Sequence, residues 1–375
     1  MLKGCRAMKK GDLPMRKTVY EIMHKDRRVA RIDETGHCKI YFKSFVPYNL
    51  YLEESEEIDA LVNNVTNFNY WCASRVLTLD RKYAKEILNS IGMTQAVTDK
   101  ERAKIALSYR CASLTDVFWV REKGERTAFS DINLYENHLS NTFIDISLRG
   151  KQYTVQNEYL ARDLSTAGRF PKAWQRVGDG FRLLKDGEKE AVERELTASR
   201  ICRCFDVSQV YYEEAVFDGE KVTASRNVTS KEYSIASMEA VEIFAQNHDR
   251  NALQYIWRLD LHNYDMMNII DYLIGNTDRH WGNWGVLVDN ATNRAKCLHP
   301  LMDFNQAFHA YDTLDGANCQ TTFPKGMTQR EAAVQAVQRT GLNQIKEVEE
   351  NVFALLPQYE KMFRQRLELL KAAEK

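Results

Sequence analysis

The feature that most constrains the fold of this chain is an apolar helical stretch that ends in a short polar loop. Residues 266–274 are apolar on nearly every side, which predicts a helix buried inside a protein core. Residues 275–283, Gly-Asn-Thr-Asp-Arg-His-Trp-Gly-Asn, follow as a loop that presents Asp278, His280 and Asn283. The fold must therefore place a group of polar side chains at the end of one buried helix.

The spacing of the polar residues indicates phosphoryl transfer. Asp278 and Asn283 are five residues apart, like the catalytic aspartate and the metal-binding asparagine of protein kinases. We expect Asp278 to orient the attacking hydroxyl and accept its proton. Asn283 and Asp303 would bind Mg²⁺ through an amide oxygen and a carboxylate, against the phosphates of ATP. Because Asp-x-His-x-x-Asn is short enough to arise by chance, a solvated turn after a helix is the alternative.

His280 is a candidate catalytic residue whose role the sequence leaves open. It could contact a phosphate or brace the loop, and a proton shuttle is a third option. Asn276 is interpreted as a helix cap. A transition-metal cluster of His280, His299 and the aspartates is a further alternative, which the kinase-like spacing disfavours.

An upstream lysine supports the same interpretation. Lys185 ends the apolar strand predicted at 181–184, where its ammonium could reach the α- and β-phosphates. The helix predicted at 188–205 would supply an ion-pair partner. We expect Glu195 in that role, with Glu193 as the alternative. The two side chains point in different directions on a helix, so only one of them can turn toward the lysine. An edge lysine whose head reaches solvent is the structural alternative.

Further nucleotide contacts are expected from two other segments. Backbone N–H groups in a turn of small residues could bind phosphate oxygens, and a lysine at its end would add charge. An ordinary turn before a hairpin is the alternative. The segment 224–228 would connect two lobes and contact adenine through its backbone, with Asn227 as the candidate residue. The candidate residues of the first turn are Ser165, Thr166, Ala167, Gly168 and Lys172.

The order of the predicted elements favours an α+β, bilobal protein-kinase-like fold with an N-terminal α/β extension. We expect an extension of unknown role at 1–150, a β-rich small lobe at 151–228 and a mainly helical large lobe at 229–375. Strands are predicted at 19–23, 28–32, 38–42, 117–120, 143–146, 174–177, 181–184, 211–216, 221–225, 284–288 and 295–298. Helices are predicted at 58–65, 81–90, 100–109, 188–205, 237–247, 252–261 and 266–274, and in the tail from 328.

Composition limits the kinds of partner. Lys plus Arg and Asp plus Glu both total 52, which argues against binding duplex DNA through bulk charge. No apolar stretch approaches the length of about 18 residues that a membrane helix needs. The eight cysteines show no paired CxxC spacing and suit a reducing compartment. We expect a soluble, cytoplasmic protein that contacts no membrane. We expect it to meet nucleic acid only through a protein partner.

Three segments resemble the HipA-like serine/threonine kinases, relatives of the phosphoinositide 3-kinase fold. Residues 273–283 resemble the catalytic loop of that family, and their Asp-Arg-His order differs from the His-Arg-Asp of ordinary protein kinases. Residues 300–305 resemble its metal-binding aspartate segment, and 165–172 its phosphate loop. The resemblance covers about residues 155–310. Two residues depart from the family pattern: Pro171 lies inside the phosphate loop, and Asn305 replaces a glycine.

The resemblance implies an ATP- and Mg²⁺-dependent serine/threonine protein kinase. It also implies that Ser165 is an autophosphorylation site that keeps the phosphate loop out of the nucleotide pocket. Two alternatives stay open: a kinase for a lipid or small molecule, and a nucleotide-binding regulator that docks a protein such as an antitoxin. The presence of Asp278, Asn283 and Asp303 argues against a regulator without catalysis.

Overall fold

The computed structural model describes residues 17–76, 98–136, 172–178, 180–309 and 311–374. These residues form mixed α/β structure with antiparallel sheets, in agreement with the predicted α+β class; the two-lobed arrangement stays a prediction. The strands are β1 (Val19–His24), β2 (Arg27–Asp33), β3 (Cys38–Ile40), β4 (Phe118–Glu122), β5 (Lys172–Val177), β6 (Gly180–Lys185), β7 (Tyr212–Phe217), β8 (Glu220–Arg226), β9 (Tyr233–Ser237), β10 (Gly285–Asp289) and β11 (Arg294–Leu298).

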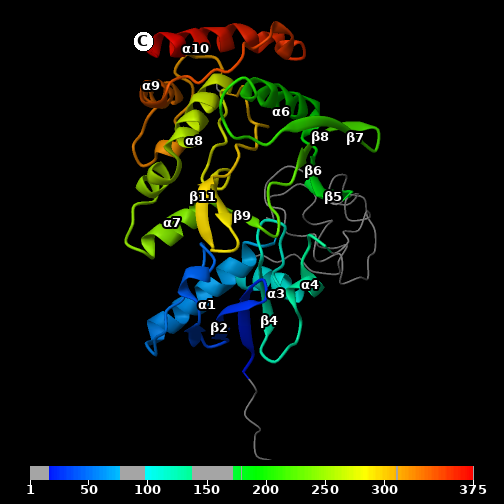
Figure 1. Ribbon diagram of the computed structural model, residues 1–375, viewed down its shortest axis with the longest axis vertical. Coiled ribbons are helices and arrows are strands. Elements are labelled where there is room, and N and C mark those ends of the chain that lie inside the picture. The colour runs from blue at the N-terminus through cyan, green and yellow to red at the C-terminus, as the bar shows by residue number, and fades with distance from the viewer. Residues whose placement is uncertain (1–16, 77–97, 137–171, 179, 310, 375) are drawn as a thin grey trace, which may run out of the picture.

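Helices cover the sheets and form the C-terminal end of the chain (Figure 1). The α-helices are α1 (Ile58–Ala73), α3 (Asp99–Ser108), α4 (Phe129–Ile132), α6 (Glu188–Cys202), α7 (Met238–Gln246), α8 (Ala252–Ile274), α9 (Gln329–Thr340) and α10 (Glu360–Ala373). Short 3₁₀ turns are η1 (Lys43–Phe45), η3 (Gln320–Thr322), η4 (Glu350–Phe353) and η5 (Pro357–Tyr359).

Local sequence signals explain where several helices begin. The side chains of Thr98 and Thr328 each accept a hydrogen bond from the backbone N–H three residues later. The glutamate at that position accepts one in return from the backbone N–H of the threonine, and the two bonds together form a capping box. Ser237 and Asn251 cap α7 and α8 through their side chains in the same way. Side-chain acceptors therefore satisfy the N–H groups that the first helical turn leaves without partners.

The central helices agree with the prediction of two helical segments. The helices predicted at 252–261 and 266–274 correspond to two helical segments of α8 that meet at a kink, where Asp260 has the non-helical angles φ −161° and ψ 72°. The side chain of Asp260 accepts hydrogen bonds from the backbone N–H groups of Asn263 and Leu298, which explains the local kink. As its apolar sequence predicted, every residue of 264–274 is buried.

One strand was not predicted. Strand β9 pairs with β10, which pairs with β11, in a three-stranded sheet of the described residues. The sequence of β9, Tyr-Ser-Ile-Ala-Ser, is short and half polar, so its strand structure depends on pairing with residues about 50 positions away. The strand predicted at 143–146 and the helix predicted at 81–90 lie outside the described residues.

A second sheet, with the order β5-β6-β8-β7 among the described strands, packs beside α6. Helix α6 also contacts α8, and the residues that these helices bury belong to one large core with Ile201, Phe205, Ile270 and Phe304. Lys185 at the end of β6 contacts Glu195 of α6, so α6 links that strand to this core and to the helix that ends at the polar loop. The fold thus brings the two sequence motifs to one place.

A third sheet, in the order β3-β2-β1-β4, forms the N-terminal part with α1 and α3 (Figure 1, bottom). This part contacts the rest of the chain in several places, and two of them are between aromatic and apolar side chains. Phe181 of β6 packs in a cluster with Leu114 and Trp119. Tyr48 stacks on Phe244 of α7, with ring centroids 4.5 Å apart. The N-terminal part therefore supports both the β5–β6 hairpin and α7.

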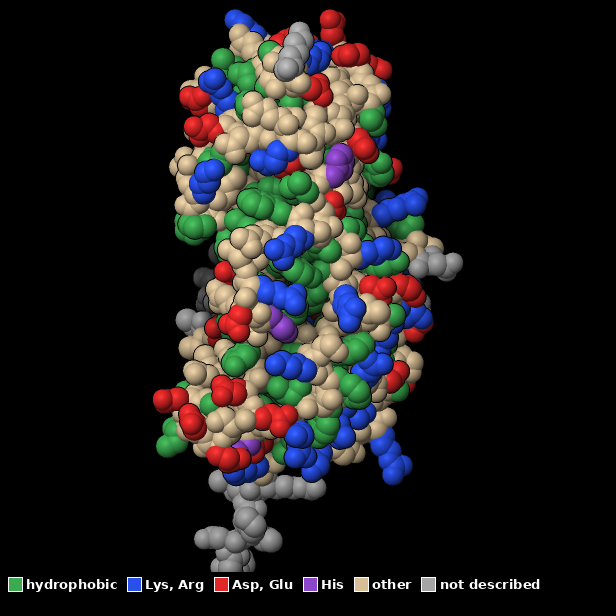
Figure 2. Space-filling view, turned by 60° about the vertical axis from the view of Figure 1, so that its left-hand side comes forward, with side chains coloured by type: hydrophobic (Ala, Val, Ile, Leu, Met, Phe, Trp, Pro, Cys, Tyr) green, Lys and Arg blue, Asp and Glu red, His purple; other side chains and the backbone are tan. Residues whose placement is uncertain are grey.

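The surface carries both charge types. On the face in Figure 2, Lys and Arg side chains gather over the middle and lower parts, and Asp and Glu side chains lie among them. Within the described ranges, no helix combines the length and the apolar character that crossing a bilayer requires.

Candidate active site

The polar loop begins where α8 ends. Gly275 terminates the helix with φ 58° and ψ 39°, a left-handed conformation that glycine adopts without strain. Asp271, one turn earlier, is buried in the last turn of the helix. The loop therefore leaves a rigid, buried helix end, which fixes where its polar residues start.

Three residues that the sequence singled out meet in one ion-pair network. The Lys185 Nζ atom lies 2.8 Å from Glu195 Oε1 and 2.8 Å from Asp303 Oδ1. Of the two candidate glutamates on α6, it is Glu195 that contacts the lysine. Its other oxygen accepts a hydrogen bond from Thr223 Oγ1 at 2.6 Å. The network joins β6, β8, α6 and the segment after β11.

The charges in this network stabilise one another. Burial alone would lower the pKa of Lys185, but Asp303 and Glu195 raise it well above its ordinary value. Burial alone would raise the pKa of Asp303, but Lys185, and after it Lys172, lower it to about 2. The lysine and the aspartate are therefore both charged at neutral pH.

Lys172 lies next to this network. It is the residue directly opposite Lys185 in the antiparallel β5–β6 ladder, and directly opposed residues project from the same face of a sheet. Its effect on the pKa of Asp303 agrees with that placement. The other candidates of the phosphate loop, Ser165, Thr166, Ala167 and Gly168, lie outside the described residues.

Arg279 fixes the polar loop against the Asp303 segment. Its Nε and Nη2 atoms donate to the two carboxylate oxygens of Asp271, at 2.8 and 3.0 Å. Its Nη1 atom donates to two main-chain oxygens, those of Asn283 at 3.0 Å and Met302 at 2.7 Å. Asn283 and the residue before Asp303 therefore lie within reach of one guanidinium nitrogen.

Asp278 and Asn283 contact each other inside the loop. The Asn283 Nδ2 atom donates to the main-chain oxygen of Asp278 at 2.8 Å and to its Oδ2 atom at 3.2 Å. Burial raises the pKa of Asp278, and the nearby charge of Asp303 adds to that rise. A raised pKa makes the carboxylate a stronger base, which is the property a proton acceptor needs.

His280 braces the loop in this structure. Its Nδ1 atom accepts a hydrogen bond from the backbone N–H of Gly282 at 3.0 Å. Its Nε2 atom lies 3.8 Å from Asp278 Oδ1, on a side chain that is about half exposed. This geometry favours the bracing role over a contact inside a closed pocket.

The donor atoms around the loop suit magnesium. The amide nitrogen of Asn283 donates to Asp278, so its amide oxygen could serve as a ligand. Together with the carboxylate of Asp303 this gives oxygen ligands, the type that Mg²⁺ prefers. Across the described ranges, no three His, Cys, Asp or Glu side chains gather in a metal-binding group, so the alternative cluster with His299 is not formed.

Asp303 has an unusual backbone conformation. Its φ of 64° lies in the left-handed region, which is uncommon for residues other than glycine. The backbone N–H of Asp303 donates to the Tyr212 hydroxyl at 3.0 Å, and Tyr212 lies next to Lys185. Strained backbone of this kind persists where surrounding contacts fix it, and it is common at functional sites.

Asn227 uses its side chain locally. Its Oδ1 atom accepts hydrogen bonds from the N–H and hydroxyl of Thr229, at 3.2 and 2.8 Å. Its backbone N–H donates to the main-chain oxygen of Phe181 at 3.0 Å. The turn therefore joins the end of β8 to β6, and the expected adenine contact at this turn stays a prediction.

Sequence patterns did not identify every residue of the network. Tyr212 and Thr223 were predicted only as strand residues, and Asp271 only as part of an apolar helix. Asn276 was interpreted as a cap, but Gly275 terminates the helix, and the Asn276 side chain instead connects Asp271 to the backbone of Asp278. One signal was available: Asp271 is an acidic residue in an otherwise apolar helical stretch.

Comparisons with known proteins identify the fold. No family model and no curated protein matches the sequence. Among solved structures, the chain is similar to HipA of the Shewanella oneidensis toxin–antitoxin system, solved with HipB and operator DNA. The TM-score is 0.58 at 12% identity, over 95% of this chain and 99% of that chain. At this identity the similarity shows a HipA-like fold and no more.

A second solved structure matches over a shorter stretch. It is the Helicobacter pylori proinflammatory kinase CtkA, with a TM-score of 0.42 and 13% identity over 54% of this chain and 90% of that chain. That score is too low to support a structural argument. The fold assignment therefore rests on the similarity to HipA.

Proposed function

We propose that this chain is an ATP- and Mg²⁺-dependent phosphotransferase that phosphorylates protein serine or threonine. The observation that carries the proposal is the double contact of Lys185 with Glu195 and Asp303, each at 2.8 Å. A buried lysine between a helix glutamate and a metal-binding aspartate is the arrangement that protein kinases need for nucleotide binding. The HipA-like fold supports the same conclusion.

Each residue of the site has a role in this proposal. Lys185 and Lys172 bind phosphate oxygens, and Glu195 orients Lys185. Asn283 and Asp303 bind Mg²⁺, which would neutralise the charge that develops on the transferred phosphate. Asp278 orients the acceptor hydroxyl and takes its proton. The backbone near Asn227 contacts the adenine, and the parts 1–150, 151–228 and 229–375 are the extension and the two lobes.

The phosphate loop is the proposed site of self-regulation. Ser165 would accept phosphate from the same chain, and Thr166, Ala167 and Gly168 would contact the nucleotide through backbone N–H groups. The support is the sequence resemblance of 165–172, together with the position of Lys172 opposite Lys185.

A protein partner is part of the proposal. The HipA structure contains HipB and operator DNA. By analogy of fold, this chain would dock a regulatory protein such as an antitoxin, and it would meet nucleic acid only through that protein.

A transfer assay tests the proposed activity. The chain is incubated with γ-labelled ATP, Mg²⁺, a peptide mixture and phosphoinositide vesicles, and labelled residues are mapped by mass spectrometry. We expect label on serine or threonine, including Ser165, and a fall of roughly 10²–10⁴-fold in Asp278→Asn, because the proton acceptor is lost. The matched control is Asp206→Asn, since Asp206 is an exposed aspartate away from the network.

Two results would contradict the proposal. Label on the lipid without label on protein would indicate a lipid kinase. ATP binding by the wild-type chain without any transfer would indicate a nucleotide-binding regulator.

A further inference from the structure

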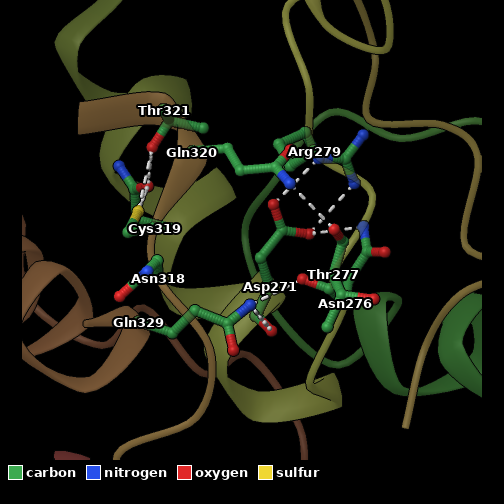
Figure 3. A pocket seen from close by; sticks show the side chains of 10 residues that line it. Asp271, Asn276, Thr277, Arg279, Asn318, Cys319, Gln320, Thr321 and Gln329 are labelled. Carbon is green, nitrogen blue, oxygen red and sulfur yellow. Dashed lines mark hydrogen bonds and ion pairs between the residues drawn. The ribbon is translucent and has the colours of Figure 1, made fainter. Parts of the chain in front are cut away.

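A small polar cavity lies behind the loop 275–283. Figure 3 shows side chains from the end of α8, from the loop and from the segment 318–329 converging on it. Its volume is about 10 Å³, which is near the smallest space that one water needs. Direct side-chain contacts therefore fill most of the gap between the loop and the segment before α9.

Gln329 makes the central contacts on the α9 side. It is the first residue of α9 and is buried. Its Nε2 atom donates to the main-chain oxygen of Asn276 at 2.6 Å and lies 3.5 Å from that of Asp271. Its Oε1 atom accepts from the backbone N–H of Ala317 at 3.1 Å. Only one orientation of the amide satisfies both sets of contacts, so the side chain is fixed in direction.

Gly316 leaves the space that the side-chain amide of Gln329 occupies. Gly316 has a φ of 69°, and a Cβ atom there would lie 2.6 Å from Gln329 Oε1. A larger residue would push the amide away from the loop. A glycine at this position thus permits the close approach.

The contact continues from Gln329 to Asp278. Asn276, whose main-chain oxygen binds Gln329, accepts a hydrogen bond from the backbone N–H of Asp278 through its own Oδ1 atom at 3.2 Å. Its Nδ2 atom donates to Asp271 Oδ1 at 3.1 Å, on the carboxylate that also binds Arg279. Gln329 therefore contacts the residue that fixes the backbone of Asp278.

We propose that Gln329 is a positioning residue that sets the place of the Asp278 carboxylate for proton transfer. This inference rests on the function proposed above and adds a residue outside the three motifs. A buried main-chain oxygen without a donor is costly, so loss of the Gln329 amide would let the loop move until Asn276 finds another partner. A shift of about 1 Å at a catalytic group can reduce a rate by roughly 100-fold.

The chain supplies a matched control. Gln320 is also a glutamine that donates to this loop, from Nε2 to the main-chain oxygen of Thr277 at 3.1 Å. Gln320 is exposed, whereas Gln329 is buried. Water can replace the Gln320 contact but has almost no room to replace that of Gln329.

The test substitutes Gln329→Glu, which keeps the size and the acceptor for Ala317 but loses the donor for Asn276. Burial raises the pKa of this carboxyl, so at a pH high enough to ionise it we expect kcat to fall roughly 10- to 100-fold, with the KM for ATP within about twofold of wild type. As the pH falls, the buried carboxyl becomes protonated and can donate again, so the ratio of variant to wild-type kcat should rise. Gln320→Glu should show a ratio near one at every pH. An unchanged kcat in Gln329→Glu would overturn the proposal.

A second measurement separates this inference from the proposed activity. Hydrogen exchange of the amides in 276–283 is compared in wild type, Gln329→Met and Gln320→Met. We expect exchange at least about tenfold faster in Gln329→Met alone, because its buried contact is lost. Equal exchange in the three proteins would overturn the positioning role even if Gln329→Glu fails to fold. Faster exchange together with a wild-type chain that transfers no phosphate would refute the kinase proposal and leave the loop contact established.

Discussion

Two regions of this molecule contain the same buried contact. In the N-terminal part, Arg75 donates to both carboxylate oxygens of Asp116, at 2.9 and 2.7 Å, and to main-chain oxygens of Cys111 and Phe118. At the polar loop, Arg279 binds Asp271 through two nitrogens and also donates to two main-chain oxygens. In both, a bidentate pair satisfies the charges while the remaining N–H groups connect separate segments.

The surroundings of the two arginines differ. Arg75 lies over the ring of Trp71, at 4.9 Å, in a cluster of apolar side chains. Arg279 is part of the loop that holds Asp278 and Asn283, and it donates to the main-chain oxygen of Met302, the residue before Asp303. The same interaction therefore supports only packing in one region and the candidate site in the other. A contact type alone does not indicate function; the groups that it positions do.

The largest difference between the regions should appear when each arginine is removed. Breaking a buried ion pair costs about 3–5 kcal/mol, so Arg75→Met and Arg279→Met should lower the free energy of unfolding by similar amounts. In the fraction that stays folded, Arg279→Met should reduce kcat by about 100-fold, because the catalytic loop loses its anchor. Urea unfolding gives the stability, and transfer per folded molecule gives the rate. An equal loss of rate in Arg75→Met would contradict the proposal that only Arg279 supports the catalytic loop.

Removing the lysine of the buried ion-pair network should reduce activity more than removing the lysine of a surface ion pair. Lys185→Met removes the cation between two carboxylates, which raises the pKa of Asp303 from about 2 and weakens phosphate binding. We expect kcat/KM to fall by roughly 10- to 100-fold. This corresponds to the free energy of about 1.5–3 kcal/mol that a hydrogen bond to a charged group contributes. The control is Lys221→Met on the neighbouring strand β8, because Lys221 forms a partly exposed pair with Glu214 at 2.9 Å. Exposed pairs contribute about 0.2–1 kcal/mol, so this control should bind ATP normally in calorimetry.

Acid should destabilise both regions through buried histidines. Burial lowers the pKa of His24 in β1 and of His299 after β11 to about 4. The unfolded value is near 6.5, so the stabilising contribution is complete above that pH and is lost as the pH falls toward 4. Each histidine should account for about 3 kcal/mol over this range. Urea unfolding of His24→Gln and His299→Gln across this range should each show a shallower pH dependence than wild type, and an unchanged slope would contradict the burial effect.

The smallest expected effect compares two buried threonines. Thr223 donates to Glu195 in the network, and Thr229 donates to the main-chain oxygen of Leu114 at the N-terminal part. Each change to valine should cost about 1–2 kcal/mol of stability, as expected for one buried hydrogen bond. Only Thr223→Val should also raise the KM for ATP, by a few fold, because Glu195 becomes less well oriented. A matched rise in Thr229→Val would show that the turn at Asn227, to which the Thr229 hydroxyl also donates, influences the nucleotide site.

Much of the fold followed from local patterns. The buried helix before the polar loop, the lysine strand and the hairpin of β10 and β11 were predicted within a few residues of their observed bounds. Strand β9 was missed, because it depends on pairing with β10, about 50 residues further along the chain. Short polar segments carry little intrinsic preference, so pairing decides their structure.

The sequence by itself determined which residue types were available: Asp278 and Asn283 five apart at a helix end, a lysine ending a strand, and an aspartate 20 residues beyond Asn283. Only the tertiary structure decided that Glu195 turns to Lys185, and that Lys185 meets Asp303 across 118 residues of chain. It likewise decided that Arg279 and Gln329 fix the loop. The physical reason is that the spacing of residues along the sequence predicts only which side chains lie on the same face of one helix or strand. Contacts between distant segments depend instead on how a whole core packs.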